Sequence, residues 1–260
     1  MVPLSAFKSD SHPPSKIICY DGAWNDGVYK TWEDFLAETA LLRAKIETVK
    51  GDKWLLHSED CWYFFLAFTA LLQCKKEILI SANVSPGYIA EIRGANNATA
   101  NNAAAAGSTV PFLTDQISDG ENDFINIPDL LAGKTSEHSE LGNIPAINAE
   151  ETSIILYTSG STGEPKAVRH RLSGLENDYF FKVSEWGEEY LKRKICTTVS
   201  QHHFYGLSSA ILLPFAMGVP FRRKRIDFPE ELEKMKDSGY AIFTVPAFLK
   251  RAVDTENTSA

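Results

Sequence analysis

The stretch SIILYTSGSTGEPK, residues 153–166, carries more information about the fold than any other part of the chain. It places an apolar strand, Ser153 to Thr158, directly before a loop of glycine, serine and threonine that a lysine closes. Gly160 and Gly163 let the backbone adopt positive φ and approach a ligand closely. Successive backbone N–H groups in such a loop form an anion-binding nest, and Lys166 adds a mobile positive charge. The pattern therefore predicts a loop that binds a polyphosphate.

The side chains of this loop fit the same chemistry. Its hydroxyls can hydrogen-bond to phosphates, and one of them can reach the Mg²⁺ that accompanies those phosphates; they belong to Thr158, Ser159, Ser161 and Thr162. The loop is not a Walker loop, because Pro165 precedes Lys166 and Ala167 follows it. The alternative is a flexible Ser/Gly turn between two strands. The apolar strand before the loop and the Pro-Lys pair after it disfavour that alternative.

The segment TSGSTGEPK resembles the phosphate-loop signature of the adenylate-forming, or AMP-binding, superfamily. That superfamily includes acyl- and aryl-CoA synthetases, luciferases and nonribosomal-peptide adenylation domains. A second segment, VSQHHFYGLSSAILLPFAMGVP at residues 199–220, is similar to the family's next motif, in which a strand delivers a histidine and an aromatic residue to the acyl pocket. The two motifs follow in the family's order and at about its spacing. The resemblance covers most of the chain except residues 95–150, and it is to the short acyl- or aryl-CoA synthetase-like proteins in particular.

The resemblance implies a two-step ligase reaction. A carboxylate attacks the α-phosphorus of ATP to give an acyl-adenylate and pyrophosphate, and a thiol of CoA or of a carrier protein then displaces AMP. It assigns the phosphates of Mg-ATP to Lys166 and to a run of loop residues, with Thr162 also near the Mg²⁺; the run is Thr158, Ser159, Gly160, Ser161, Thr162 and Gly163. It places His203 beside the substrate carboxylate and Gly206 at the start of the following helix. His203 and Lys166 are thus the expected catalytic residues.

Considered alone, the residues of the second motif leave alternatives open. A His202–His203 pair beside an aromatic residue is also typical of a packed strand end. Carboxylates or thiolates at metal-ligand spacing are missing around it, so the pair does not indicate a metal site. Phe204 and Tyr205 fit the wall of an acyl pocket, and core packing suits Phe204 equally well.

Other parts of the family pattern are missing from this sequence. We find no Tyr-Gly-x-Thr-Glu-like motif for adenine and magnesium, no later aspartate for the ribose, no hinge and no C-terminal lid domain with its catalytic lysine. Ala167 also replaces the glycine that usually follows the loop lysine. The resemblance therefore implies an N-terminal part with little activity alone. The alternatives are a non-catalytic nucleotide- or carboxylate-binding module, or one half of a split enzyme. Uncovered sheet edges make self-association another possibility.

The first half of the chain has the alternation of a parallel α/β fold. Residues 17–30 predict a hairpin, and Thr31 with Asp34 forms a variant of the capping box before a helix that ends near Thr48. A strand at 54–58, a helix from 58–60 to about Cys74 and a strand at 77–82 follow. This order predicts parallel or mixed sheets flanked by helices, the incomplete N-terminal domain of the adenylate-forming fold. The tract ANNATANNAAAAG, residues 95–107, predicts a mobile surface loop, and 116–150 a long polar connection.

The second half predicts a further α/β subdomain, so that residues 1–150 and 151–260 form two parts. Ser173 to Glu176 resembles a capping box before a helix that ends near Lys192. Gly218 ends an apolar helix. The remaining predicted elements are a strand at 195–200, the apolar helix at 207–217, a helix from Pro229 to Gly239, a strand at 240–245 and a last helix from Pro246 before a polar tail at 254–260.

Composition sets the remaining limits. The 260 residues are 44% hydrophobic and 23% charged, as in ordinary soluble domains, and the net charge of −8 argues against nucleic acid or an anionic membrane as the main partner. The apolar runs are too short to span a bilayer, and the N-terminus does not resemble a signal peptide. The four cysteines form no C-x-x-C pair, and Cys19 and Cys196 fall in predicted buried strands. These features favour a reducing cytoplasm.

Overall fold

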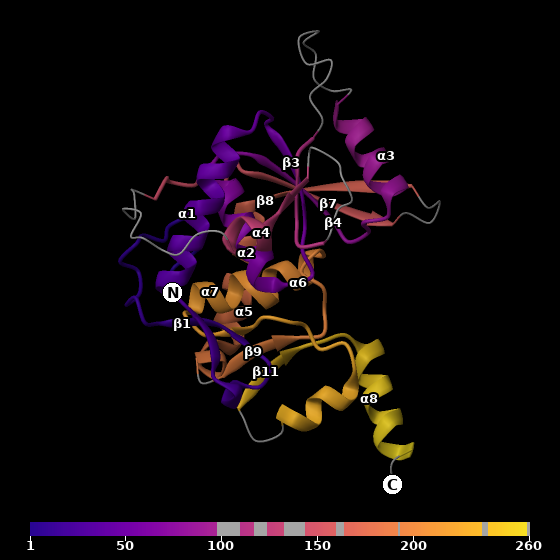
Figure 1. The fold of residues 1–260 in the computed structure, drawn as a ribbon. Coiled ribbons are helices and arrows are strands. Elements are labelled where there is room, and N and C mark those ends of the chain that lie inside the picture. Colours follow the sequence, from indigo (N-terminus) through magenta and orange to yellow (C-terminus); the bar gives the residue numbers. More distant parts are fainter. Residues whose placement is uncertain are drawn as a thin grey trace. The chain divides into compact units, whose positions relative to one another are not determined.

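The computed structural model describes residues 1–97, 110–116, 124–132, 144–159, 164–191, 193–235 and 239–258 (Figure 1). The chain forms two compact units, Met1–Phe35 with Leu175–Ala260, and Leu36–Gly174. Each unit is built on one β-sheet with helices, so the predicted mixed α/β class is confirmed. None of the described helices combines the length and the apolar character needed to cross a bilayer.

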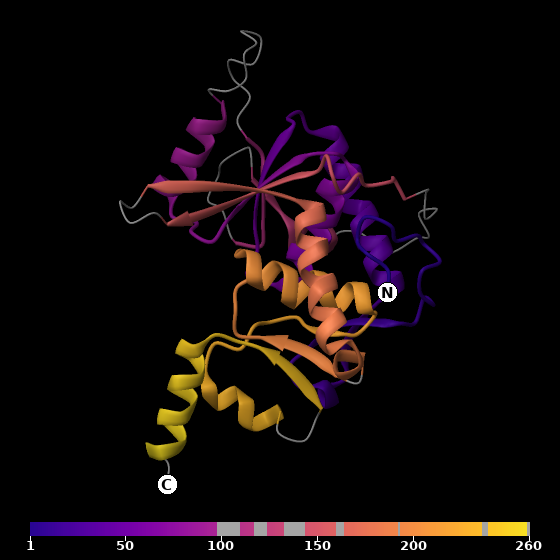
Figure 2. The same cartoon turned by 180° about the vertical axis from the view of Figure 1, so that it is seen from behind.

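The sheet of the unit Leu36–Gly174 has six strands in the order β6-β5-β3-β4-β7-β8. All neighbouring strands are parallel except β7 and β8, which run side by side in opposite directions (Figure 2). The strands are β3 (Lys53–His57), β4 (Glu77–Ser81), β5 (Phe112–Thr114), β6 (Phe124–Asn126), β7 (Ser153–Ser159) and β8 (Pro165–Arg171). The helices are α2 (Cys61–Gln73), α3 (Pro86–Asn97) and α4 (Ile127–Ala132).

The order of these strands determines where two of the helices lie. The connection from β3 through α2 reaches β4, whereas the connection from β4 through α3 leads back past β3 to β5. Since such parallel crossovers are right-handed, the reversal of direction puts α2 and α3 on opposite faces of the sheet. Tyr88, Ile89 and Ile92 of α3 accordingly pack in one apolar cluster with Leu55 and Leu79 of the strands.

Helix α2 forms because its first turn is capped and its whole surface is apolar. The Asp60 carboxylate accepts hydrogen bonds from the backbone N–H of Trp62 at 2.9 Å and of Tyr63 at 3.3 Å. Such a cap satisfies N–H groups that have no partner inside the helix. All of its residues except Tyr63 are buried, as a helix that is apolar nearly all round requires.

The sheet of the other unit has five strands in the order β11-β9-β10-β1-β2. Only the β1–β2 pair, the predicted hairpin, is antiparallel. The strands are β1 (Ile17–Asp21), β2 (Val28–Thr31), β9 (Lys194–Thr197), β10 (Phe221–Arg222) and β11 (Tyr240–Phe243). The helical elements are η1 (Trp24–Asp26), α6 (Phe204–Gly206), the π-helical turn η3 (Leu207–Leu212), α7 (Leu213–Met217), η4 (Pro229–Met235) and α8 (Pro246–Thr258).

Two long helices, α1 (Trp32–Thr48) and α5 (Leu172–Leu191), each include residues of both units. The predicted cap of α1 is confirmed, because Thr31 N and Oγ1 donate to Asp34 Oδ2 at 2.7 and 2.9 Å. The predicted capping box of α5 is wrong. That helix already begins at Leu172, and the Glu176 carboxylate accepts hydrogen bonds from Ser5 N and Ser5 Oγ, both at 2.9 Å. Ser5, which is distant in the sequence, thus binds the carboxylate that a local capping box would have used.

Four other features differ from the sequence predictions. The polar connection at 116–150 contains β6 and α4, and β8 follows the glycine-rich loop directly. The last helix continues to Thr258, where a polar tail was expected. Residues 95–97 of the Asn/Ala tract belong to α3, and the rest of the tract lies outside the described residues.

The buried Glu176 predicts a pH effect on stability. Burial raises the pKa of this carboxyl above its ordinary value of 4.5, although the hydrogen bonds from Ser5 act to lower it. The native state therefore binds more protons than the unfolded state just above pH 4.5, so the free energy of unfolding falls as pH rises through that range. We expect Glu176→Gln to remove this part of the pH dependence in urea titrations. Glu189→Gln, on the exposed side of the same helix, is the control. An unchanged slope in Glu176→Gln would contradict the assignment.

Candidate functional site

The predicted phosphate loop connects two paired strands. Thr158 directly follows the buried residues of β7, which end at Tyr157, and pairs with Lys166 of β8; Ser159 pairs with Pro165. The Thr158 hydroxyl lies 3.5 Å from the Lys166 carbonyl oxygen. Gly160, Ser161, Thr162 and Gly163 lie outside the described residues. The predicted strand before the loop is confirmed, and the hairpin itself suits both a phosphate loop and a plain turn.

The charges along β8 distinguish Lys166 from its neighbours. Arg169 forms an ion pair with Glu77 and also contacts Ser153. Arg171 NH1 lies 3.6 Å from a Glu150 carboxylate oxygen. Lys166 is exposed, and no acidic partner occurs for it within the described ranges. Among the described residues of this strand, Lys166 is therefore the cation whose charge can meet an anionic ligand.

Two residues that the sequence did not indicate hold the strand before the loop in place. Asn96 of α3 donates a hydrogen bond to the Tyr157 hydroxyl at 2.8 Å, and Lys53 Nζ lies 3.3 Å from Asn96 Oδ1. Tyr157 is buried in the cluster that packs α3 on the sheet. These contacts anchor the residue next to Thr158. No local sequence pattern predicts these hydrogen bonds, because Lys53, Asn96 and Tyr157 lie far apart in the sequence.

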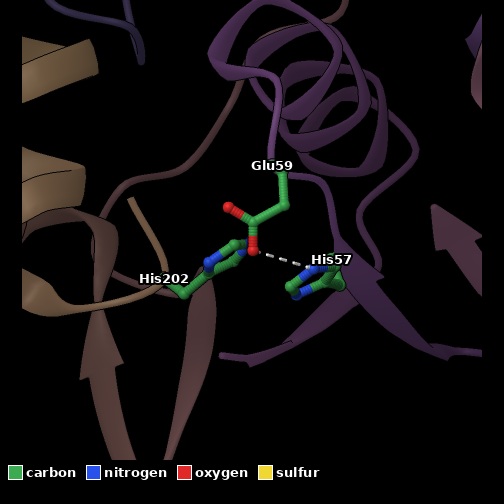
Figure 3. Close-up of side chains that lie close together, drawn as sticks. All are labelled: His57, Glu59 and His202. Carbon is green, nitrogen blue, oxygen red and sulfur yellow. Dashed lines mark ion pairs between the residues drawn. The ribbon is translucent and has the colours of Figure 1, made fainter. Parts of the chain in front are cut away.

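The carboxyl ends of the central strands of the same sheet carry further polar groups. His57 ends β3 and is buried; its Nδ1 lies 2.8 Å from the Ser81 carbonyl oxygen, and its Nε2 lies 3.5 Å from Glu59 Oε1 (Figure 3). The Asp115 carboxylate accepts hydrogen bonds from Ser58 Oγ at 2.8 Å and Asp60 N at 3.0 Å. Ligand sites of open parallel sheets form at this edge. No local sequence pattern links His57 to these partners.

The second motif forms a tight turn after β9. The His203 backbone N–H donates to the Ser200 carbonyl oxygen at 3.2 Å, and Ser200 Oγ lies 2.8 Å from His202 Nδ1. His202 is thereby buried, while His203 retains an exposed ring. Partial burial of that ring, and then the charge of Arg225, lower the pKa of His203. The neutral form of the His203 imidazole is therefore favoured.

Gly206 is required at its position by this turn. A Cβ atom on Gly206 would lie 2.0 Å from the Ser200 carbonyl oxygen and 2.6 Å from its carbon. The Leu207 N–H donates to the His203 carbonyl at 2.8 Å, so the helical segment starts directly beyond the turn. Gly206 was expected to open the helix, but the helical segment begins two residues earlier, at Phe204: α6 ends at Gly206 and η3 follows without a break.

The two aromatic residues of the motif lie beside His203. Tyr205 is 38% exposed, and its ring centroid lies 6.3 Å from that of Phe243. Burial, and then the charge of Asp178, raise the pKa of Tyr205. Phe204 is half-buried. The structure thus brings His203, Phe204 and Tyr205 together in one unit, and it places Thr158, Ser159 and Lys166 in the other.

The chain belongs to the AMP-binding enzyme family, whose model matches residues 9–260. Among curated proteins it is 27% identical over 117 residues to a malonate–CoA ligase of Arabidopsis thaliana, covering 40% of this chain and 19% of that protein. It is 35% identical over 77 residues to a medium-chain-fatty-acid–[acyl-carrier-protein] ligase of Moorena producens, covering 29% of this chain and 13% of that protein. The matched segments are thus less than a fifth of these relatives.

Solved structures show the same fold. The N-terminal subdomain of Klebsiella oxytoca NpsA, in complex with 3-hydroxyanthranilyl-AMSN, has a TM-score of 0.68 at 18% identity, covering 94% of this chain and 60% of that one. The o-succinylbenzoate coenzyme A synthetase of Bacillus subtilis, in complex with AMP, has a TM-score of 0.69 at 18% identity, covering 95% and 62%. The predicted N-terminal subdomain fold of the adenylate-forming enzymes is therefore confirmed, and the chain spans about three fifths of these structures.

Proposed function

We propose that the chain acts in the ATP-dependent activation of a carboxylic acid to an acyl-adenylate, as the N-terminal part of an acyl- or aryl-CoA synthetase-like ligase. The observation that carries this proposal is the match of the AMP-binding family model to residues 9–260. Both curated relatives are acid–thiol ligases by name, one for CoA and one for a carrier protein. Either thiol is therefore a candidate acceptor in the second step.

The β7–β8 hairpin is the proposed phosphate site. Lys166 fits this role because its exposed ammonium group has no acidic partner in the described ranges, and Thr158 offers a hydroxyl at the end of the buried strand. With Ser159 and the residues from Gly160 to Gly163, they would hold the β- and γ-phosphates. Mg²⁺, held through Thr162, would neutralise phosphate charge. Fixed donors that stabilise the departing pyrophosphate lower the barrier without any proton transfer.

The turn after β9 is the proposed acid site. A carboxylate is already ionised at neutral pH, so its attack on the α-phosphorus needs no general base. The neutral ring of His203 suits a hydrogen bond that orients the carboxylate, and Gly206 keeps the turn tight. Phe204 and Tyr205 provide the neighbouring aromatic surface. Holding the two reactants in line is the main contribution expected of such a site.

We also propose where the other parts of the active site lie and in which compartment the protein works. We propose that the adenine and ribose contacts, and a C-terminal lid domain with its catalytic lysine, come from outside residues 1–260. All four cysteines are free thiols, and three of them are buried, which suits a reducing cytoplasm. Residues 151–260 carry both proposed subsites, those for the phosphates and for the acid.

Pyrophosphate exchange into ATP tests this function. We expect exchange close to background when the chain is incubated with Mg-ATP and malonate, octanoate or benzoate. Exchange should rise when a polypeptide supplies the rest of the AMP-binding fold, for example the corresponding segment of the B. subtilis synthetase. His203→Gln in the same mixture should lower the exchange again. Strong exchange by the chain alone would contradict its incompleteness. If the chain bound neither Mg-ATP nor any of the three acids, the ligase proposal would be contradicted.

A further inference from the structure

A small polar cluster joins helix α5 to the π-helical turn η3. Lys182 Nζ lies 2.8 Å from Ser209 Oγ and 3.3 Å from Ser208 Oγ. Asp178, one turn earlier on α5, forms an ion pair with Lys182 and accepts a hydrogen bond from the Ser208 hydroxyl. Both serines are fully buried, whereas the side chains of Asp178 and Lys182 are 29% and 12% exposed. The ion pair thus supplies the hydrogen bonds without which two buried hydroxyls would destabilise the fold.

The two serines are consecutive, and this links the ion pair to the shape of the helix. In an α-helix each backbone N–H bonds to the carbonyl four residues earlier. From Leu207 to Leu212 the backbone is instead π-helical, and the Leu213 N–H donates to the Ser208 carbonyl five residues earlier. Such turns are rare and are frequent at functional sites. The ion pair therefore ties two consecutive residues of this turn to α5.

The same lysine contacts the segment that carries the proposed acid-binding residues. Lys182 Nζ lies 5.2 Å from the centroid of the Tyr205 ring, within the range of cation–π attraction. His203 and Tyr205 directly precede the π-helical turn, and the Leu207 N–H donates to the His203 carbonyl at 2.8 Å. A return of the turn to α-helical geometry would therefore rotate both side chains.

We infer that Asp178 and Lys182 are positioning residues for acid binding: they hold the π-helical turn η3, and the turn orients His203 and Tyr205. The inference rests on the proposed function, from which it takes the acid-binding role of His203 and Tyr205. Asp178 and Lys182 act through the turn and touch no substrate. Because the two charges neutralise each other, the pair provides no counter-ion for a second anionic group on the acid.

Histidine and tyrosine ring signals in NMR spectra test the inference without any turnover. The variants are Lys182→Met and Lys182→Arg, with His203→Gln and Tyr205→Phe to assign the signals. In Lys182→Met we expect the His203 and Tyr205 signals to shift and the His203 pKa, which burial and Arg225 hold down, to move toward 6.5. Lys182→Arg, which keeps the charge, should restore most of the wild-type spectrum.

Lys194→Met is the matched control. Lys194 Nζ also lies over aromatic rings of the same unit, 5.1 Å from the Trp24 centroid and 5.2 Å from that of Tyr240. Its replacement removes comparable contacts and should leave the His203 and Tyr205 signals unchanged. Binding of octanoate and benzoate should weaken about tenfold in Lys182→Met alone, since the loss of one well-placed hydrogen bond has an effect of about this size.

The outcomes separate the inference from the proposed function. If Lys182→Met lowers the melting temperature but leaves the His203 and Tyr205 signals in place, the ion pair is only structural and the inference is overturned. If the wild-type chain binds neither acid, the proposed acid site fails, and the NMR comparison still decides whether the pair orients these two residues. If Lys182→Met does not fold, Ser209→Ala replaces it, because it removes a single contact of the cluster.

Discussion

Lys166→Ala should weaken the binding of Mg-ATP about ten- to hundredfold, which calorimetric titration of the purified chain would measure. Hydrogen bonds to charged groups contribute about 1.5–3 kcal/mol, which corresponds to that range of affinity. The effect should be large because Lys166 is exposed on β8 without an acidic partner in the described ranges, whereas Arg169 is paired with Glu77. Its full charge is thus available to the phosphates.

Arg171→Ala is the control for this experiment. Arg171 lies on the same strand and is also exposed, but Glu150 is 3.6 Å away and the side chain lies at the far end of the hairpin from the loop. We expect affinity within about twofold of the wild type, because exposed ion pairs contribute little. Equal affinities of Lys166→Ala and the wild type would contradict the phosphate role of Lys166. If neither protein bound Mg-ATP, the loop would depend on adenine and ribose contacts from elsewhere.

Gly206→Ala should destabilise the chain by about 3 kcal/mol or more, the upper range for overpacking a closed site. The added Cβ would lie 2.0 Å from the Ser200 carbonyl oxygen, so the backbone itself must move. That movement opens the turn that holds His203, so acid binding should be lost along with stability. Urea-induced unfolding, followed by tryptophan fluorescence, gives the change in free energy.

Gly174→Ala provides the matched comparison. Gly174 lies in the first turn of α5, and a Cβ atom there would meet nothing within 4 Å. An alanine inside a helix is more stable than glycine by about 0.5–1 kcal/mol, so this variant should gain stability. If both glycine variants changed stability by the same amount, the close approach at Ser200 would not be the cause.

The sequence predicted those parts of the fold that depend on neighbouring residues. The β1–β2 hairpin, the Thr31–Asp34 cap and the buried helix α2 follow from turn formers, a capping pair and an apolar run. The strand before the phosphate loop is equally local. The family motif placed His203 and Gly206 in one turn, and the structure shows a backbone approach there that only glycine allows.

The features that escaped prediction depend on distant partners. Glu176 has the spacing of a capping residue, yet Ser5, 171 residues away, takes its carboxylate. Strand β8, with the sequence PKAVRHR, has no alternation of apolar and polar residues that would predict it, and it is recognised by its pairing with β7 at the edge of the sheet. The π-helical turn has no sequence signal of its own, and the lysine that supports it lies on another helix. The pairing of His57 with Ser81 likewise joins separate strands.

Because β7 pairs with β8 in the antiparallel sense, the proposed phosphate loop would have to attract a nucleotide without a following helix. In many nucleotide-binding folds a strand leads through a loop into a helix, whose macrodipole adds positive potential at the phosphates. Here the chain passes from one strand to another, and β-strands have only small net dipoles. The attraction must then come from backbone N–H groups and from an exposed ammonium group. Dissolved salt screens such a charge over about 8 Å at physiological ionic strength, so ionic strength should control nucleotide occupancy in this family of loops.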